Sequence, residues 1–175
     1  MQLKKLVKIE LRSIYLKLNN KKGDTMPIKN YTTKIDCYQS IGEIQGALAK
    51  HGARQIMIDY DENGKPTGIA FKLVNSNQSQ AFILPANIDG VLEALKKQRI
   101  KVDREQAEKT AWRNVRDWIF AQMAFIESGN VEVDEIFLPY LTDGKKTLYQ
   151  AYKTGQLLIG NGSNVGDDYE TDLQT

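Results

Sequence analysis

The chain has 175 residues, of which 41% are hydrophobic and 26% are charged, so it can bury a core and is unlike a disordered chain. Its 24 basic and 22 acidic residues leave a net charge of +2, which is too small to indicate a nucleic-acid partner without local clustering. The sequence contains no run of about 18 apolar residues, which is the length needed to cross a membrane. The single cysteine excludes an intrachain disulfide or a cysteine-rich zinc site and is typical of a reducing cytoplasm.

The first 25 residues are interpreted as a non-native extension. Residues 21–25, KKGDT, come directly before Met26. One possible coding sequence for these residues contains GGAG, the core of a ribosome-binding site, a few bases before the ATG codon of Met26. We therefore expect translation in nature to begin at Met26, and a genuine basic N-terminal arm is the alternative. Glu10, Arg12 and Lys17 interrupt the apolar residues, so this segment is not a signal peptide.

The next residues predict a short strand and then a helix. Residues 31–36 are rich in Thr and Ile, as strands are. Ser40 and Glu43 have the spacing of a capping box, and the apolar residues that follow share one helical face until Gly52. We expect this helix to begin at Ser40.

A β-hairpin is the clearest pattern in the chain. Residues 54–60 alternate between apolar and polar, and so do residues 69–73. Asn63-Gly64 lies between them and suits the positive backbone angles of a tight turn. A second turn at 75–80 and a short strand at 81–84 complete a three-stranded antiparallel meander.

Helices are predicted for the C-terminal half. Asn87 caps the first, and Asp103 opens a long helix that runs to about Glu127. The expected core stripe of the long helix is Ala111, Val115, Trp118, Ile119, Gln122 and Ile126, with Trp112 beside it. Residues 131–141 fit either a strand or a helix, and 147–153 predict a short helix.

These elements predict the α+β class: a short antiparallel β-meander with an early helix, followed by a helical half with one long helix. The expected domain spans residues 26–159. Residues 160–175 are rich in Gly, Asn, Ser and acidic side chains and are expected to be a disordered acidic tail.

Three patterns superficially suggest chemistry, and each has a better structural explanation. Residues 59–64 open like an EF-hand, but Ala70 stands where the bidentate Glu is needed. The glycine-rich segment 160–166 leads into acidic residues that would repel a phosphate. Cys37 and His51 bracket one helix and lie too far apart for a nucleophilic pair. No cofactor or metal site is therefore predicted.

The region 96–116 has a local excess of basic residues. On the long helix, Lys109, Arg113, Arg116 and Phe120 fall at helical spacing and predict an outward stripe of cations with one aromatic side chain. Such a stripe suits a phosphate backbone or an acidic protein. The alternative is a solvated helix face, neutralised by pairing of Glu105 with Lys109 and of Arg113 with Asp117.

Several segments resemble a family of small uncharacterised proteins of phages and prophages of Gram-positive bacteria. The resemblance rests on MPIKNYTTKID, LAKHGARQIMIDYDENGKP, LPANIDGVLEALKKQ, DWIFAQMAFIESG and EIFLPYLTDGKKTLYQ and covers about Met26 to Gly160. The resemblance implies that translation starts at Met26. It also implies that the protein is encoded by a mobile genetic element and acts in a bacterial cytoplasm. It implies no activity and no site residues.

The leading functional hypothesis is a non-enzymatic accessory protein that binds nucleic acid or a nucleoprotein complex, in replication, recombination or the countering of host defence. The first alternative is a protein–protein inhibitor of a host defence enzyme that uses Phe120 and its neighbours. The second is a magnesium-dependent enzyme that uses scattered carboxylates such as Asp59, Asp61, Asp134 and Glu135.

Overall fold

The computed structural model of the chain describes residues 26–75 and 78–156. The expected N-terminal extension, 1–25, and the glycine-rich acidic tail, 160–175, lie outside the described residues. The fold is α+β, as predicted, with a three-stranded antiparallel sheet and several helices. Among the described residues, no helix combines the length and the apolar character that a membrane crossing requires.

The sheet is the predicted meander. Its strands are β1 (Ala53–Tyr60), β2 (Pro66–Asn75) and β3 (Gln78–Pro85), in the order β1-β2-β3. Across the sheet, Ile56 pairs with Phe71 and Phe71 with Phe82, so one row of apolar side chains lies on the inner face. The strand alternation seen in the sequence therefore identifies the buried face correctly.

The β1–β2 turn uses one positive backbone angle rather than two. Gly64 has φ +69°, and Asn63 is not among the residues with positive φ. The Asp61 carboxylate accepts hydrogen bonds from the backbone N–H groups of Asn63 and Lys65, both at 2.9 Å. This is the pattern of a short loop that ends in a left-handed glycine.

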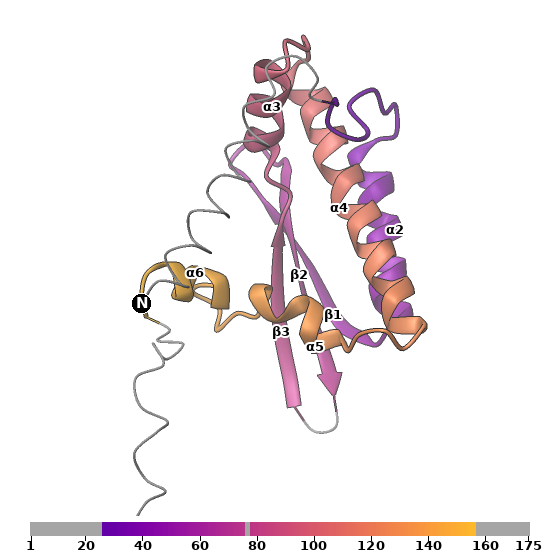
Figure 1. Cartoon of the computed structure of the whole chain (residues 1–175), viewed down its shortest axis with the longest axis vertical. Coiled ribbons are helices and arrows are strands. Elements are labelled where there is room, and N and C mark those ends of the chain that lie inside the picture. The colour runs from indigo at the N-terminus through magenta and orange to yellow at the C-terminus, as the bar shows by residue number, and fades with distance from the viewer. Residues whose placement is uncertain (1–25, 76–77, 157–175) are drawn as a thin grey trace, which may run out of the picture.

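Two long helices lie side by side on the sheet (Figure 1). Helix α2 (Cys37–Lys50) and helix α4 (Arg104–Glu127) run in the same direction, since Cys37 contacts Glu108 near their N-termini and Lys50 contacts Glu127 near their C-termini. The inner faces of both helices pack against the sheet. Where the two helices face one another, their side chains form the ion pairs that are described in the next subsection.

The predicted start of α2 is wrong. The helix begins at Cys37, and Asp36 caps it by accepting from the N–H of Tyr38 at 2.8 Å. Ser40, predicted as the cap, is fully buried inside the helix, and its hydroxyl has no hydrogen-bond partner among the described residues. The capping box does not form, because the N–H of Ser40 already donates to the carbonyl of Asp36 within the helix, and Glu43 is bound by two arginines of α4.

The strand predicted at residues 31–36 is also wrong. This segment forms turns along α4, because side chains of the helix take up its carbonyl groups. The Gln106 amide donates to the carbonyls of Tyr31 and Thr33 at 3.0 and 2.9 Å. The Thr110 hydroxyl is 3.3 Å from the carbonyl of Asn30. The backbone therefore needs no neighbouring strand.

The caps predicted at Asn87 and Asp103 are confirmed, and the short helix predicted at 147–153 is present. Asn87 caps α3 (Ile88–Lys97), Asp103 caps α4, and Thr147 caps α6 (Leu148–Lys153). The ambiguous segment is helical: α5 (Val133–Phe137) is followed directly by the 3-10 helix η1 (Leu138–Tyr140). Pro139 fits η1 because a proline is tolerated in the first turn of a helix.

The core joins the sheet to α2, α4 and α5. Phe71, Phe82 and Phe137 form an aromatic cluster with ring centroids 5.3 to 5.7 Å apart. Trp112, expected beside the core stripe of α4, is fully buried, and its indole N–H donates to the carbonyl of Pro66 at 3.1 Å. The buried arc of α4 is wider than predicted because the helix packs against α2 and α3 as well as the core.

Candidate binding surface

The predicted stripe of α4 does not form a free cationic surface. Lys109 lies 2.6 Å from Glu105 of the same helix, which is the pairing that the alternative interpretation expected. Arg113 and Arg116 turn toward α2 and keep only 18% and 23% of their side-chain surface exposed. Arg113 and Arg116 therefore do not form the outward part of the stripe that the sequence predicted.

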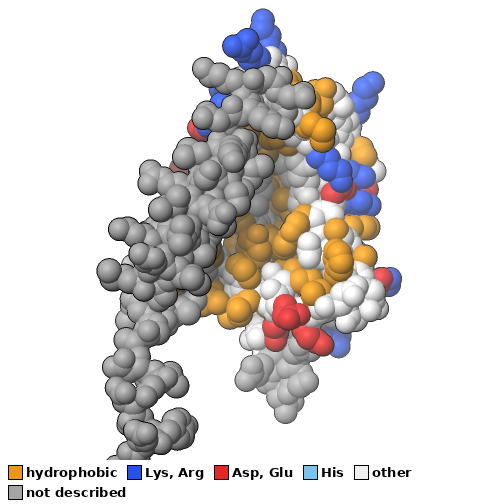
Figure 2. Space-filling view, viewed as in Figure 1, with side chains coloured by type: hydrophobic (Ala, Val, Ile, Leu, Met, Phe, Trp, Pro, Cys, Tyr) orange, Lys and Arg blue, Asp and Glu red, His pale blue; other side chains and the backbone are white. Residues whose placement is uncertain are grey.

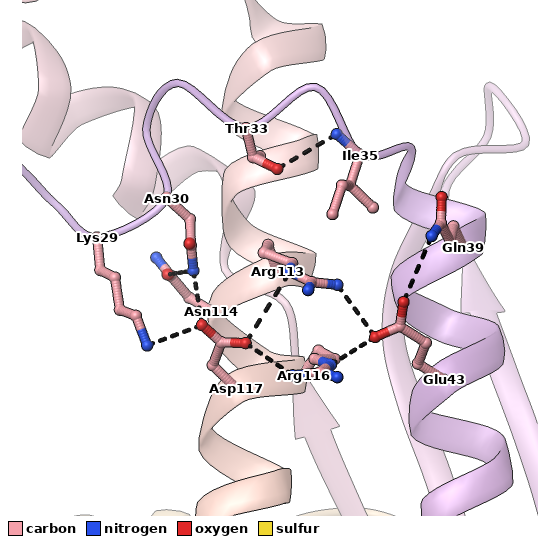
Figure 3. A network of polar contacts seen from close by, with 10 residues as sticks. All are labelled: Lys29, Asn30, Thr33, Ile35, Gln39, Glu43, Arg113, Asn114, Arg116 and Asp117. Carbon is pink, nitrogen blue, oxygen red and sulfur yellow. Dashed lines mark hydrogen bonds and ion pairs between the residues drawn. The ribbon is translucent and has the colours of Figure 1, made fainter.

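Glu43 of α2 explains the direction of both arginines (Figure 3). Its Oε2 atom accepts from the Nε atom of Arg116 at 2.5 Å and from a terminal nitrogen of Arg113 at 3.1 Å. Partial burial alone would raise the pKa of Glu43, but the bonds and charges of Arg116 and Arg113 outweigh it and lower this pKa. Two cations of the stripe are thus committed to one carboxylate.

Asp117 extends the same network to the N-terminal segment (Figure 3). Its carboxylate lies 3.2 Å from Arg116, 2.8 Å from Lys29 and 3.0 Å from the amide nitrogen of Asn30. Burial opposes ionisation, but the hydrogen bonds from Lys29, Asn30 and Arg116 prevail and hold the pKa of Asp117 at about 2. We call Glu43, Arg113, Arg116 and Asp117 the interhelix network.

Phe120, the aromatic member of the stripe, lies beside this network. The Arg116 guanidinium carbon is 3.6 Å from the centroid of the Phe120 ring, close enough for a cation–π contact. The ring remains 36% exposed. One face of the ring is therefore taken by an intramolecular partner, which leaves less of it for stacking on a ligand than the sequence indicated.

Unpaired cations lie instead between α3 and α4. Four basic residues occupy six successive positions where α3 ends and the chain turns into α4, and all four are exposed: Lys96, Lys97, Arg99 and Lys101. None of them forms an ion pair within the described part of the chain. We call this group the basic turn. Figure 2 shows Lys and Arg side chains at the end of the molecule where α3 lies.

The basic turn has an unusual backbone. Arg99 has φ +61°, a left-handed conformation that helix ends usually give to glycine. The N–H of Ile100 donates to the carbonyl of Leu95 at 3.0 Å, which closes the end of α3 and fixes this geometry. An open hollow of about 640 Å³ lies beside it, lined by Ile100, Val102, three of the cations and Asp103, the cap of α4. The turn is thus a defined shape rather than a loose loop.

The carboxylates proposed for magnesium are not gathered into one site. Asp59 and Asp61 lie at the β1–β2 turn, whereas Asp134 and Glu135 lie on α5. Among residues 26–75 and 78–156, no group of three or more His, Cys, Asp and Glu side chains is arranged to hold a metal ion. The Asp61 carboxylate is already occupied by backbone amides of its own turn.

Cys37 and His51 lie at opposite ends of α2, as the sequence indicated. The Cys37 thiol donates to buried Glu108 at 3.0 Å, and burial together with this carboxylate raises the pKa of Cys37 to about 12. The His51 ring lies 2.7 Å from the carbonyl of Ala47 and 2.9 Å from Glu127. Both side chains are therefore occupied by structural contacts at their own helix ends.

Comparisons with protein-family models, with characterised proteins and with solved structures give no match for this chain. Sequence reasoning found the basic region but placed the free cations on the wrong part of it. The signal it missed was Glu43, whose partners on α4 are about 70 residues away in the chain.

Proposed function

We propose that the protein is a non-enzymatic accessory protein that binds nucleic acid, or a nucleoprotein complex, through the basic turn. The observation that carries this proposal is the set of four exposed cations at Lys96, Lys97, Arg99 and Lys101, none of them paired within the described residues. Unpaired Lys and Arg side chains gain most from neutralising phosphates, because each contact releases counterions.

The contrast with the stripe of α4 supports the choice of the basic turn. Arg113 and Arg116 would have to leave Glu43 and Asp117 before they could bind a phosphate. The cations of the basic turn have no such intramolecular competitor in the described residues. A polyanion therefore binds these cations without first breaking ion pairs of the folded protein.

The backbone at Arg99 supports the same proposal. A non-glycine residue in the left-handed region costs roughly 1 kcal/mol or more, and such residues cluster at functional sites. The sequence places an arginine there, although glycine would fit the geometry at lower cost. We take this as a sign that the side chain of Arg99 is needed at this position.

The biological setting of the proposal rests on the resemblance to phage and prophage proteins. It suggests action in a bacterial cytoplasm, in replication, recombination or the countering of host defence. A nucleic-acid or nucleoprotein partner fits each of these settings.

A protein partner is the second candidate, and the outer face of the sheet favours it. Met57 and Val74 are each more than half exposed there, although side chains of this kind are normally buried. Figure 2 shows further hydrophobic side chains gathered in the middle of the face it draws. Under this proposal the protein inhibits a host defence enzyme through the sheet rather than through Phe120.

Charge reversal at the basic turn tests the main proposal. Binding of fluorescein-labelled single-stranded and double-stranded DNA to the Arg99→Glu/Lys101→Glu variant should weaken roughly tenfold or more, if each contact contributes about 0.7 kcal/mol. The matched control is Arg54→Glu/Lys72→Glu, which reverses one exposed Arg and one exposed Lys on the sheet. Equal weakening in both variants, or no binding by the unmodified protein, would refute the assignment and leave the protein-partner candidate.

A further inference from the structure

A pocket of about 680 Å³ lies between β3 and the segment that carries η1 and α6. Its apolar lining comes from Ile83 and Pro85 of β3 and from Pro139 of η1. Ile83 belongs to the outer face of the sheet, because it pairs with Ala70 while its neighbours Phe82 and Leu84 are buried on the inner face. The pocket therefore opens on the outer side of β3, and none of its lining residues belongs to the basic turn.

Two tyrosines provide flat aromatic surfaces in this pocket. The ring of Tyr140 is held in place from behind, with its centroid 5.6 Å from that of Trp118. Tyr149 of α6 is 54% exposed, and the ammonium group of Lys153 lies 5.8 Å from the centroid of its ring, which leaves the other face of the ring for stacking. Together with the two prolines, these rings suit a planar group that is bound by stacking.

Lysines at the rim give the pocket a positive edge. The turn between Thr142 and Thr147 holds Lys145 and Lys146 beside the pocket, because the carboxylate of Asp143 accepts from both of their backbone N–H groups at 2.9 and 3.0 Å. These bonds lower the pKa of Asp143, which keeps it ionised, but Asp143 does not line the pocket.

The two lysines differ in their availability. Lys146 contacts the side chain of Gln156, whereas Lys145 has no ion-pair partner among the described residues. No ion pair among the described residues therefore competes with an anion for the ammonium group of Lys145, which lines the pocket.

The remaining polar groups leave little capacity for reading base edges. Thr147 and Gln150 bond one another in the cap of α6, and Thr142 bonds the backbone of its own turn. The side-chain nitrogen of Gln150, which lines the pocket, donates no hydrogen bond within the described residues. A planar ring would thus be held mainly by stacking, which accepts every base.

We infer that this pocket binds the base and phosphate of one nucleotide, with the ring between Tyr149 and the apolar wall and the phosphate at Lys145. The combination of flat aromatic and proline surfaces with a free lysine matches a planar group that carries a negative charge. A free nucleotide and one nucleotide of a single strand share this chemistry. The inference goes beyond the basic turn and uses none of its residues.

The test uses the full chain, titrated with thymidine monophosphate, with thymidine, with inorganic phosphate and with a five-nucleotide thymidine oligomer. Backbone amide NMR signals of Lys145, Tyr149 and Gln150 are followed. We expect the monophosphate to shift all three signals, thymidine to bind several-fold more weakly, and phosphate alone to leave the Tyr149 signal unchanged. Equal responses to phosphate and to the monophosphate would overturn the inference, and so would the absence of any shift.

Variants separate the pocket from general attraction to the surface. Tyr149→Ala and Lys145→Glu should each weaken monophosphate binding at least fivefold, while thermal melts stay close to that of the unmodified protein. Tyr38→Ala and Arg54→Glu are the matched controls, since Tyr38 is 50% exposed and both residues lie outside the pocket. Weakening by the controls to the same degree would overturn the pocket.

The oligomer distinguishes the two sources of the ligand. Much tighter binding of the oligomer than of the monophosphate identifies a strand as the ligand, and equal binding identifies a free nucleotide. The Arg99→Glu/Lys101→Glu variant keeps the pocket intact and should still bind the monophosphate. The prediction for the pocket and the prediction for the basic turn are thus tested by different experiments, so either one can fail without the other.

Discussion

Glu43 and Arg116 link the two long helices of the protein. The Nε atom of Arg116 on α4 lies 2.5 Å from Oε2 of Glu43 on α2, and both side chains are largely shielded from solvent. The same oxygen also binds Arg113. The sequence pattern predicts that Arg113 and Arg116 point outward, but this contact places both of them in the interface between α2 and α4.

Reversing the charge of Arg116 should destabilise the fold. Arg116→Glu places two carboxylates together in a shielded contact, so we expect the free energy of unfolding to fall by about 2 kcal/mol. Urea denaturation measures this change. Lys109→Glu is the control on the same helix, and its exposed partner Glu105 predicts almost no effect. An Arg116→Glu variant as stable as the unmodified protein would show that the contact contributes nothing.

Asp117 predicts how stability depends on acid. Its pKa is about 2 in the folded protein and 3.8 as the ordinary value, so its contribution is fully present above about pH 4 and is lost as the pH falls toward 2. A shift of this size corresponds to about 2 kcal/mol. Asp117→Asn should remove that part of the pH dependence, which thermal melts between pH 2 and pH 6 can measure. An unchanged pH profile in the variant would contradict the pKa assigned to Asp117.

The sequence could predict those parts of the fold that local patterns determine. Alternation identifies the inner face of the meander, and Asn87 and Asp103 mark helix starts because their side chains cap the adjacent turns. The start of α2 could not be predicted in this way. Asp36 and Ser40 both have capping chemistry, and only the burial of Ser40 in the folded protein decides between them.

The candidate site could not be predicted from local patterns either, because it also depends on contacts that form only in the folded protein. A basic stripe and a neutralised helix face have the same sequence pattern, and the outcome depends on whether a distant carboxylate reaches the arginines. Glu43 does so from another helix. The cations of the basic turn have no ion-pair partner among the described residues, because they lie in the last turn of α3 and in the chain that follows it, a position that periodicity on α4 does not reveal.

Gly64 provides a test of the hairpin. Its φ of +69° is unfavourable for a β-branched side chain, so Gly64→Val should lower the free energy of unfolding by roughly 1 kcal/mol or more. Gly64→Asn is the matched variant, because asparagine tolerates the left-handed region, and it should cost less. Thermal melts compare the two, and equal losses would argue against strain at this position.

Cys37 should be unreactive in the folded protein. Burial and the neighbouring Glu108 raise the pKa of its thiol to about 12, so almost no thiolate is present near neutral pH. We expect a thiol reagent such as a disulfide dye to label the folded protein very slowly at pH 8 and to label the protein completely in urea. Rapid labelling without denaturant would show that the contact between Cys37 and Glu108 opens readily.

The salt dependence of DNA binding tests the central claim most directly. With four phosphate contacts at the basic turn, the logarithm of the association constant for duplex DNA should fall with the logarithm of salt concentration with a slope of about −3.6. The Arg99→Glu/Lys101→Glu variant should bind more weakly and lower this slope to about −1.8, because two contacts are lost. The same affinity and the same slope in the variant and in the unmodified protein would contradict binding through the basic turn.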